Sequence, residues 1–263
     1  MKVKILMDGG RPKVDPGELK RVIKDAGLEM TTGRADLGVV VGGDGVFGEY
    51  GRTETVPLLF VGVRSNKVTG SKAFLAAAYY DELPEVLERV KTGSFKVSEQ
   101  KRLEVFKNQK SLGEVFTDVY VQRGAESNCL RYKVRTKGEG ASTEEAVIGD
   151  GVVVTTAAGS TGYYSYPERI SGGGFRASAF SKFRIDQLGI CHINPTYIER
   201  SGSMEPPFRY TVPWGSQVEI SLFRDADARV YGVQSGRDGV RVSKNDRVTV
   251  VPGEHSTRVI SFD

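Results

Sequence analysis

One carboxylate, that of Asp44, stands among the glycines Gly42, Gly43 and Gly45, directly after an apolar run of β-branched residues. Glycine lets the backbone approach a ligand closely, and successive N–H groups in such a turn can cradle a phosphate. A carboxylate at this point works against anion binding unless it holds a metal ion or takes a proton. The combination therefore predicts phosphoryl-transfer chemistry.

A second segment, residues 149–165, leads from an Asp-Gly pair through an apolar strand into a turn rich in glycine, serine and threonine. Hydroxyl and amide groups of this turn could hold a ribose or a pyrophosphate. Tyr163 and Tyr164 offer flat, amphipathic faces for a planar base. Taken alone, the segment is equally well explained as a glycine-rich loop between strands, with both tyrosines packing.

The stretch from Gly43 to Gly48 also fits the dinucleotide-binding pattern G-x-G-x-x-G. That pattern requires a crossover helix of about a dozen residues before the next parallel strand. Only residues 49–56 separate Gly48 from the next apolar run, which argues against a dehydrogenase. A tight turn with Asp44 as an ordinary turn residue is the other alternative.

Several other chemistries lack their residues. The chain has no P-loop signature and no G-x-S-x-G, and its two histidines without a C-x-x-C make a transition-metal site improbable. His192 follows Cys191 in an apolar run, which favours a core or pocket-lining histidine. Arg64 and Lys67 follow a strand and could contact phosphate, although a solvated loop explains them equally well.

The first hundred residues alternate strand and helix patterns. Apolar runs predict strands at 2–7, 37–41 and 57–63, and helical spacing predicts helices over 19–26 and 83–90. Continuous apolar strands between amphipathic helices indicate a parallel α/β arrangement.

From about residue 100 the pattern changes to short strands separated by glycine, serine and Asn/Asp turns, with little helical periodicity. The sequence therefore predicts a Rossmann-like α/β domain followed by an antiparallel, β-rich, sandwich-like domain. The expected strands lie at 115–122, 130–136, 151–156, 217–223, 229–233 and 247–251.

The composition is that of an ordinary globular protein, with 39% hydrophobic residues, 27% charged residues and a mild net charge of +4. Because the positive residues are spread out, we expect anionic small molecules as partners and no nucleic acid. No apolar run is long enough for a membrane span. Two cysteines far apart in the sequence, Cys129 and Cys191, favour a cytoplasmic protein.

Together, the two glycine-rich segments resemble the NAD kinase family. Gly-Gly-Asp-Gly follows an apolar strand, and Asp-Gly, a strand and Gly-Ser-Thr-Gly-Tyr follow later in the chain. The similarity extends over nearly the whole sequence. It continues through residues 57–75, 81–102, 115–124, 190–195 and 235–239.

The resemblance implies a kinase that transfers a phosphate from ATP, or from polyphosphate, to the 2′-hydroxyl of the adenosine ribose of NAD, giving NADP. Asp44 would accept the hydroxyl proton or place Mg²⁺, and Gly43 and Gly45 would leave room for phosphates. The implied substrate and nucleotide contacts are Thr117, Asp118, Asp150, Ser160, Thr161, Gly162, Tyr163 and Ser165.

The resemblance further implies a homodimer or homotetramer. The change of pattern near residue 100 predicts a first domain over residues 1–100. The β-rich domain would cover residues 101–250, and residues 251–263 would return to the first domain.

Four residues at three places depart from the family's pattern. Val46 stands where the family usually has threonine, Thr117-Asp118 replaces an Asn-Glu pair, and Ala157 replaces a proline. These departures leave two alternatives open. One is a kinase of the same fold that acts on another hydroxyl, of a sugar, nucleoside or lipid. The other is a protein that binds NAD(P) or another nucleotide without catalysis.

Overall fold

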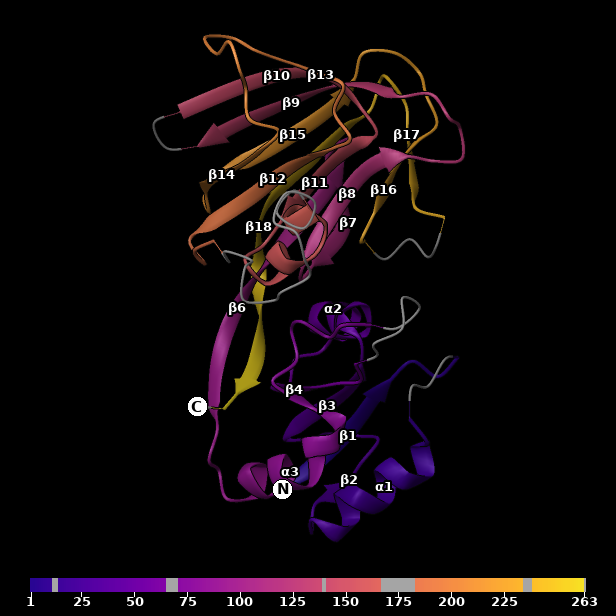
Figure 1. Cartoon of the computed structure of the whole chain (residues 1–263), viewed down its shortest axis with the longest axis vertical. Helices are drawn as coiled ribbons and strands as arrows, with labels where there is room; N and C mark the ends of the chain where they lie inside the picture. Colours follow the sequence, from indigo (N-terminus) through magenta and orange to yellow (C-terminus); the bar gives the residue numbers. More distant parts are fainter. Residues whose placement is uncertain (11–13, 65–70, 139–140, 167–182, 234–237, 263) are drawn as a thin grey trace. The chain divides into compact units, whose positions relative to one another are not determined.

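The computed structural model describes residues 1–10, 14–64, 71–138, 141–166, 183–233 and 238–262 (Figure 1). The chain divides into two compact units, Met1–Gln100 with Ser256–Asp263, and Lys101–His255. Each unit has its own hydrophobic core.

The first unit is built on a parallel sheet in which β1 (Lys2–Met7), β3 (Leu37–Gly42) and β4 (Leu58–Gly62) are neighbours. β2 (Glu29–Met30) pairs with β1, and β5 (Ala78–Tyr79) pairs with β4. Every residue of β3 and β4 is buried, as expected for strands covered on both faces.

Helices cover both faces of this sheet. α1 (Pro16–Asp25) and α3 (Leu83–Lys91) share a core with Val39 and Val41 on one face. α2 (Asp44–Thr53) lies on the other face, where the ring of Phe47 stacks on Phe60 at 4.5 Å between centroids. A 3₁₀ turn, Tyr80–Glu82, leads into α3.

The second unit is a sandwich of two mainly antiparallel sheets whose inner faces form one core. One sheet has the order β13-β10-β9-β15-β18, with the β6–β7 hairpin paired to β18. Its strands are β6 (Lys96–Lys107), β7 (Lys110–Val115), β9 (Leu130–Gly138), β10 (Ala141–Gly149), β13 (Tyr197–Arg200), β15 (Gln217–Leu222) and β18 (Arg247–Ser261).

The other sheet has six strands in the order β14-β12-β11-β8-β16-β17. They are β8 (Asp118–Arg123), β11 (Gly151–Thr155), β12 (Gln187–Ile193), β14 (Arg209–Pro213), β16 (Ala228–Tyr231) and β17 (Val240–Val242). Two 3₁₀ turns follow β11: η2 (Ala158–Thr161) and η3 (Tyr163–Ser165).

The last strand, β18, begins in the second unit and ends in the first. There it pairs with β4 in parallel, Val259 opposite Leu58, and buries Ile260 completely. The Thr257 hydroxyl donates a hydrogen bond to the carbonyl oxygen of Gly51. The end of the chain therefore completes the core of the first unit.

The predicted fold class, an α/β unit plus an antiparallel β-rich unit, is confirmed. One inference was wrong: α2 begins at Asp44, inside the glycine motif, so a crossover helix does connect the parallel strands β3 and β4. The argument from the short segment 49–56 failed because it started the helix after Gly48.

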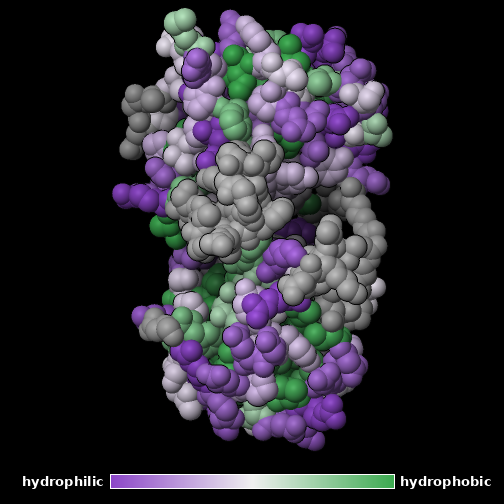
Figure 2. Space-filling model, in the orientation of Figure 1, coloured by the Kyte–Doolittle hydropathy of each residue, from purple (hydrophilic) through white to green (hydrophobic). Residues whose placement is uncertain are grey.

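The surface in Figure 2 intersperses hydrophilic and hydrophobic residues on the face in view. Within the described ranges, the helices are too short or too polar to cross a membrane.

Candidate functional site

The carboxyl ends of β1, β3 and β4 meet at one edge of the first unit's sheet, since Met7 lies opposite Val41 and Gly42 opposite Gly62. The strand order reverses between β1 and β3, and in open α/β sheets such a switch point is where ligands bind. Gly43 and Asp44 follow β3 directly at this point. The fold thus places the predicted catalytic carboxylate where this class of sheet holds its ligands.

Asp44 is the first residue of α2, where the helix dipole favours a negative charge. Its half-buried carboxylate accepts hydrogen bonds from the backbone N–H groups of Phe74, at 3.1 Å, and Leu75, at 2.9 Å. An ionised carboxylate has about four acceptor positions, so two hydrogen bonds leave room for a metal ion or a hydroxyl. The side chain is held in place and can still act chemically.

The two glycines beside Asp44 differ. A Cβ on Gly43 would lie 2.5 Å from the Ser71 hydroxyl oxygen, so any side chain there would clash. A Cβ on Gly45 would have no heavy atom within 4 Å, and the residue is exposed. Gly43 is needed for packing, whereas Gly45 keeps the start of α2 open.

Arg64 follows β4 at the same sheet edge, and its guanidinium lies 4.0 Å from the centroid of the Tyr79 ring. The side chain is exposed, and this contact gives it a defined position. Lys67, the other predicted phosphate contact, lies outside the described residues.

In the second unit, the register of β8 and β11 pairs Asp118 with Thr155. The Thr117-Asp118 pair and the turn that follows Thr155 therefore lie at the same end of the six-stranded sheet. The Thr156 backbone N–H donates to the Thr117 carbonyl oxygen at 2.8 Å. A Cβ on Gly159 would lie 2.5 Å from that oxygen, so this close approach requires glycine.

Asp118 is bound by the hydroxyl of the residue before it. Thr117 Oγ1 donates to Asp118 Oδ1 at 3.0 Å. Burial outweighs hydrogen bonding and raises the pKa of Asp118 to about 6. A Cβ on Gly162 would lie only 3.1 Å from Asp118 Oδ2, which brings the glycine-rich turn against the carboxylate.

The two adjacent tyrosines have different environments. Tyr163 is 50% exposed and meets Tyr120 edge to face, with 5.2 Å between ring centroids. Tyr164 is buried and packs against Phe183 and Cys191. Of this pair, Tyr163 presents an exposed ring, while Tyr164 is a packing residue.

The predicted serine and threonine contacts in this turn are all buried. Ser160 Oγ donates to the Ala157 carbonyl oxygen at 2.7 Å, and Ser165 Oγ donates to that of Gly162 at 2.8 Å. Their hydroxyl protons stabilise the 3₁₀ turns η2 and η3, and Thr161 is the last residue of η2.

Asp150 lies at the opposite end of β11 from this group, about 17 Å along an extended strand. Its Oδ1 forms an ion pair with Arg123 Nε at 2.8 Å, and its Oδ2 accepts from Asn194 Nδ2 at 3.0 Å. Within the second unit, the structure brings Thr117, Asp118 and residues 160–163 together and leaves Asp150 apart.

Sequence reasoning missed Tyr120, which lies on the same face of β8 as Asp118 and whose ring meets Tyr163 edge to face. Its signal was the two-residue period of a strand, which puts Asp118 and Tyr120 on one face of β8.

It also missed a buried polar network between the two sheets. Glu145, fully buried on β10, accepts from Tyr210 at 2.7 Å and Arg200 Nε at 2.7 Å, and lies 3.0 Å from His192 Nε2. His192 Nδ1 lies 3.0 Å from the Tyr132 hydroxyl. The predicted core histidine is confirmed, and its role is to join the two sheets.

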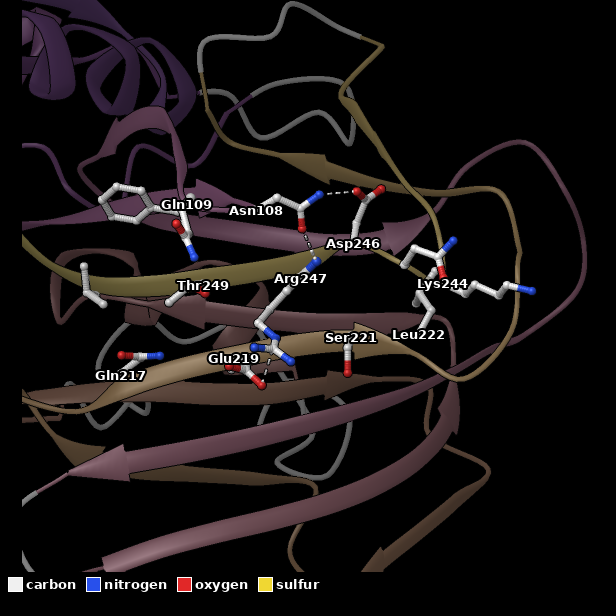
Figure 3. Close-up of a pocket in the computed structure, with 13 residues that line it drawn as sticks. Asn108, Gln109, Gln217, Glu219, Ser221, Leu222, Lys244, Asp246, Arg247 and Thr249 are labelled. Carbon is white, nitrogen blue, oxygen red and sulfur yellow. Dashed lines mark hydrogen bonds and ion pairs between the residues drawn. The ribbon is translucent and has the colours of Figure 1, made fainter.

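A groove of about 800 Å³ lies on the outer face of β15 and β18 (Figure 3). All its charged groups form ion pairs, Arg247 Nε with Glu219 inside the groove at 3.2 Å, and Asp246 and Lys244 with Lys107 and Asp225 outside its lining. Asn108 donates to Asp246 and accepts from the Arg247 backbone N–H. It contains none of the predicted site residues.

No model of a known protein family matches the chain. The NAD kinase of Magnetococcus marinus is 29% identical over 233 residues, which cover 86% of this chain and 68% of that protein. The yeast NADH kinase, solved with NADH, superposes with a TM-score of 0.71 at 16% identity, over 100% of this chain and 84% of that one. An NAD kinase from Archaeoglobus fulgidus, solved with ATP, gives 0.67 at 18% identity, over 100% and 94%. The fold and the predicted resemblance to NAD kinases are confirmed.

Proposed function

From the similarity to NAD kinases over most of the chain, we propose that this protein transfers the terminal phosphate of ATP to the adenosine-ribose 2′-hydroxyl of NAD, giving NADP. The observation that carries the proposal is the extent of the match, 86% of the chain to a relative named NAD kinase. The position of Asp44 at the switch point of the parallel sheet supports it.

Asp44 is proposed as the group that receives the proton of the acceptor hydroxyl. Its carboxylate is fixed by Phe74 and Leu75, so it needs no reorganisation before it acts. Phosphoryl transfer requires mainly positioning and charge stabilisation, so a single placed carboxylate with backbone donors can suffice.

We propose that Asp44 also helps to hold Mg²⁺. This ion binds proteins through one or two carboxylates and fills its other positions with water and substrate phosphates. That mode fits the half-buried carboxylate of Asp44, whose two hydrogen bonds leave acceptor positions open. When bound, Mg²⁺ would neutralise charge on the transferred phosphate.

The nucleotide contacts are proposed at Thr117, Asp118, Gly162 and Tyr163. An ionised Asp118 accepts hydrogen bonds from ribose hydroxyls or amines, and the exposed ring of Tyr163 offers a face for a base. These contacts are supported by the turns η2 and η3, which contain Ser160, Thr161 and Ser165. Asp150 and Arg64 stay candidates for separate contacts with the dinucleotide or its phosphates.

A non-catalytic nucleotide-binding protein is the second candidate. Both oxygens of Asp44 already accept backbone hydrogen bonds, a structural role that needs no catalysis. Val46 packs over Gly42 with a methyl group where the family usually has a threonine hydroxyl.

The experiment incubates the purified chain with NAD and Mg²⁺ and with either ATP or polyphosphate, and detects NADP with a coupled dehydrogenase. NADP formed with ATP supports the proposal, and a higher rate with polyphosphate would correct the donor. Binding of NAD by calorimetry without NADP from either donor would establish the non-catalytic alternative. Binding of neither nucleotide would point to a kinase of another hydroxyl. The proposed homodimer or homotetramer is tested by light scattering on the same sample.

A further inference from the structure

Residues 71–77 form a loop without helix or strand, and this loop supplies the two N–H groups that bind Asp44. Phe74 donates to Oδ2 and Leu75 to Oδ1, so two neighbouring residues of the chain converge on one carboxylate. Neighbouring N–H groups point to opposite sides of an extended strand. They converge on one anion in a turn where the backbone changes hand.

Ala73, the residue before these two donors, makes the change of hand. Its φ is +49°, in the left-handed region that residues other than glycine rarely adopt. Alanine has no polar side chain that could compensate by a hydrogen bond to its own backbone. The contacts around Ala73 are therefore what keeps it in this conformation.

Two contacts hold Ala73. Ser71 Oγ accepts a hydrogen bond from the Ala73 N–H at 3.0 Å, which closes a tight turn. The Ala73 side chain is 1% exposed and packs on Gly62 at the end of β4, where a Cβ on the glycine would lie 2.6 Å from that of Ala73. Packing thus fixes the place of the alanine, and the Ser71 hydroxyl fixes the direction of its N–H and with it φ.

The same hydroxyl also lies against the glycine motif. A Cβ on Gly43 would be 2.5 Å from Ser71 Oγ, and Gly43 directly precedes Asp44. Ser71 therefore contacts the backbone next to Asp44 and also binds the loop that donates to its carboxylate.

We propose that Ser71 is a positioning residue for the Asp44 carboxylate. Its hydroxyl holds Ala73 in the left-handed conformation and so directs the N–H groups of Phe74 and Leu75 onto the two carboxylate oxygens. An oriented carboxylate presents its remaining acceptor positions in one direction, as a base or a metal ligand requires. The reaction that Asp44 serves rests on the proposed function, but the link from Ser71 to Asp44 does not.

The first test needs no ligand. Ser71→Ala removes the hydroxyl, and amide hydrogen exchange followed by NMR reports on each N–H separately. The amides of Phe74 and Leu75 should exchange about tenfold faster, the scale of one lost hydrogen bond. The amides of Phe60 and Val61, inside the buried strand β4, should keep their rates.

Thr31→Ala is the matched control. The Thr31 hydroxyl accepts from the Gly33 N–H at 3.1 Å, the same hydrogen bond across two residues, in a turn that follows β2. Its removal should leave the exchange of Phe74 and Leu75 unchanged.

The second test uses the kinase reaction. Ser71→Ala should lower kcat about tenfold and leave the KM for NAD within about twofold, because the carboxylate loses its orientation and no substrate contact is removed. Glycine adopts a positive φ without steric cost. Adding Ala73→Gly to Ser71→Ala should therefore restore kcat to within about threefold of the original, since the loop no longer needs the hydroxyl.

Unchanged exchange at Phe74 and Leu75 in Ser71→Ala would overturn the proposal. So would an equal acceleration in β4, because that marks a general loss of stability. A kcat that the added Ala73→Gly does not restore would also overturn it, since Ser71 would then act through its contact with Gly43 and not through the loop.

If the unaltered protein forms no NADP, the proposed function fails, and hydrogen exchange still decides whether Ser71 fixes the loop. Faster exchange of both amides then supports the link, and unchanged exchange overturns it. Ser71→Cys, which puts a weakly accepting sulfur in the same place, gives the same comparison if Ser71→Ala does not fold.

Discussion

At Asp44, one carboxylate combines a structural and a proposed chemical role. We expect Asp44→Asn to lower kcat for NADP formation by about 100-fold or more, the scale of a lost general base. The asparagine amide would also face one of the N–H donors of Phe74 and Leu75, so Tm should fall as well. Steady-state kinetics and thermal unfolding measure the two effects separately.

Asp25→Asn is the control, because it neutralises an exposed carboxylate at the end of α1, outside the proposed site. It should keep kcat within about twofold. Full activity in Asp44→Asn, or equal losses in both variants, would remove Asp44 from the chemistry.

The exposed ring of Tyr163 leads to a separate prediction about nucleotide binding. We expect Tyr163→Ala to raise the KM for NAD about tenfold, since stacking of a base on an aromatic ring contributes about 1–3 kcal/mol. The kcat should change little. Tyr197→Ala is the control, because that ring is 55% exposed on β13 and Tyr163 is 50% exposed. An unchanged KM in the Tyr163 variant would make this tyrosine a packing residue.

At the scale of elements, apolar runs predicted the buried strands. The helix α2 and the strand β10 carry no such run and were missed. β3 and β4 appear in the sequence as continuous apolar runs. α2 escaped prediction because Gly45, Gly48 and Gly51 give it a low helix propensity, and packing of Phe47 on Phe60 compensates.

β10 escaped prediction because Glu144 and Glu145 are poor strand residues. The side chains that stabilise this strand come from elsewhere in the sequence. Glu145 is bound by His192, Arg200 and Tyr210, which come from other strands.

The candidate site was predictable as residue types and less so as geometry. The resemblance singled out Asp118 and Tyr163, but only the pairing of Asp118 with Thr155 shows that their segments meet. The same register places Asp150 next to the first residue of β11, at the end of the strand that is far from Asp118 and Tyr163. Tyr120 was identifiable from the two-residue period of the expected strand 115–122, which puts it on the same face as Asp118.

The buried network gives the prediction at this scale. Glu145→Gln should lower the free energy of unfolding by about 3 kcal/mol at pH 7, because it leaves Arg200 and His192 without their carboxylate. Urea unfolding measures this. Glu144→Gln is the neighbouring control, with a half-exposed side chain that pairs with Lys133 and Arg135 on the outer face, and it should change stability far less.

The same network has a pH signature. Burial tends to raise the pKa of Glu145, but hydrogen bonds from His192, Tyr210 and Arg200 prevail and lower it below 4.5. Its contribution to stability is therefore complete above pH 4.5 and is lost as pH falls through the lower folded value. The stability gap between the original protein and Glu145→Gln should narrow below pH 4.5, and a constant gap would contradict this assignment.

For the whole molecule, the end of the chain belongs to the core of the first unit. Ile260→Ala should lower the stability of that unit by about 3 kcal/mol, the usual effect of emptying a fully buried site. The single tryptophan, Trp214, packs on the core of the second unit and reports on it alone. We expect circular dichroism to show an earlier transition while tryptophan fluorescence keeps its midpoint. Equal shifts of both signals would mean that the two units unfold together.

The central claim, phosphorylation of NAD on its adenosine ribose, is tested most directly by ³¹P NMR of the reaction product. Purified protein with NAD, ATP and Mg²⁺ should produce ADP and a new phosphomonoester signal that coincides with the 2′-phosphate of added NADP. The signal should be absent when Asp44→Asn replaces the original protein at equal concentration and time. Unchanged NAD, or a phosphate at any other position of the dinucleotide, would contradict the proposed function.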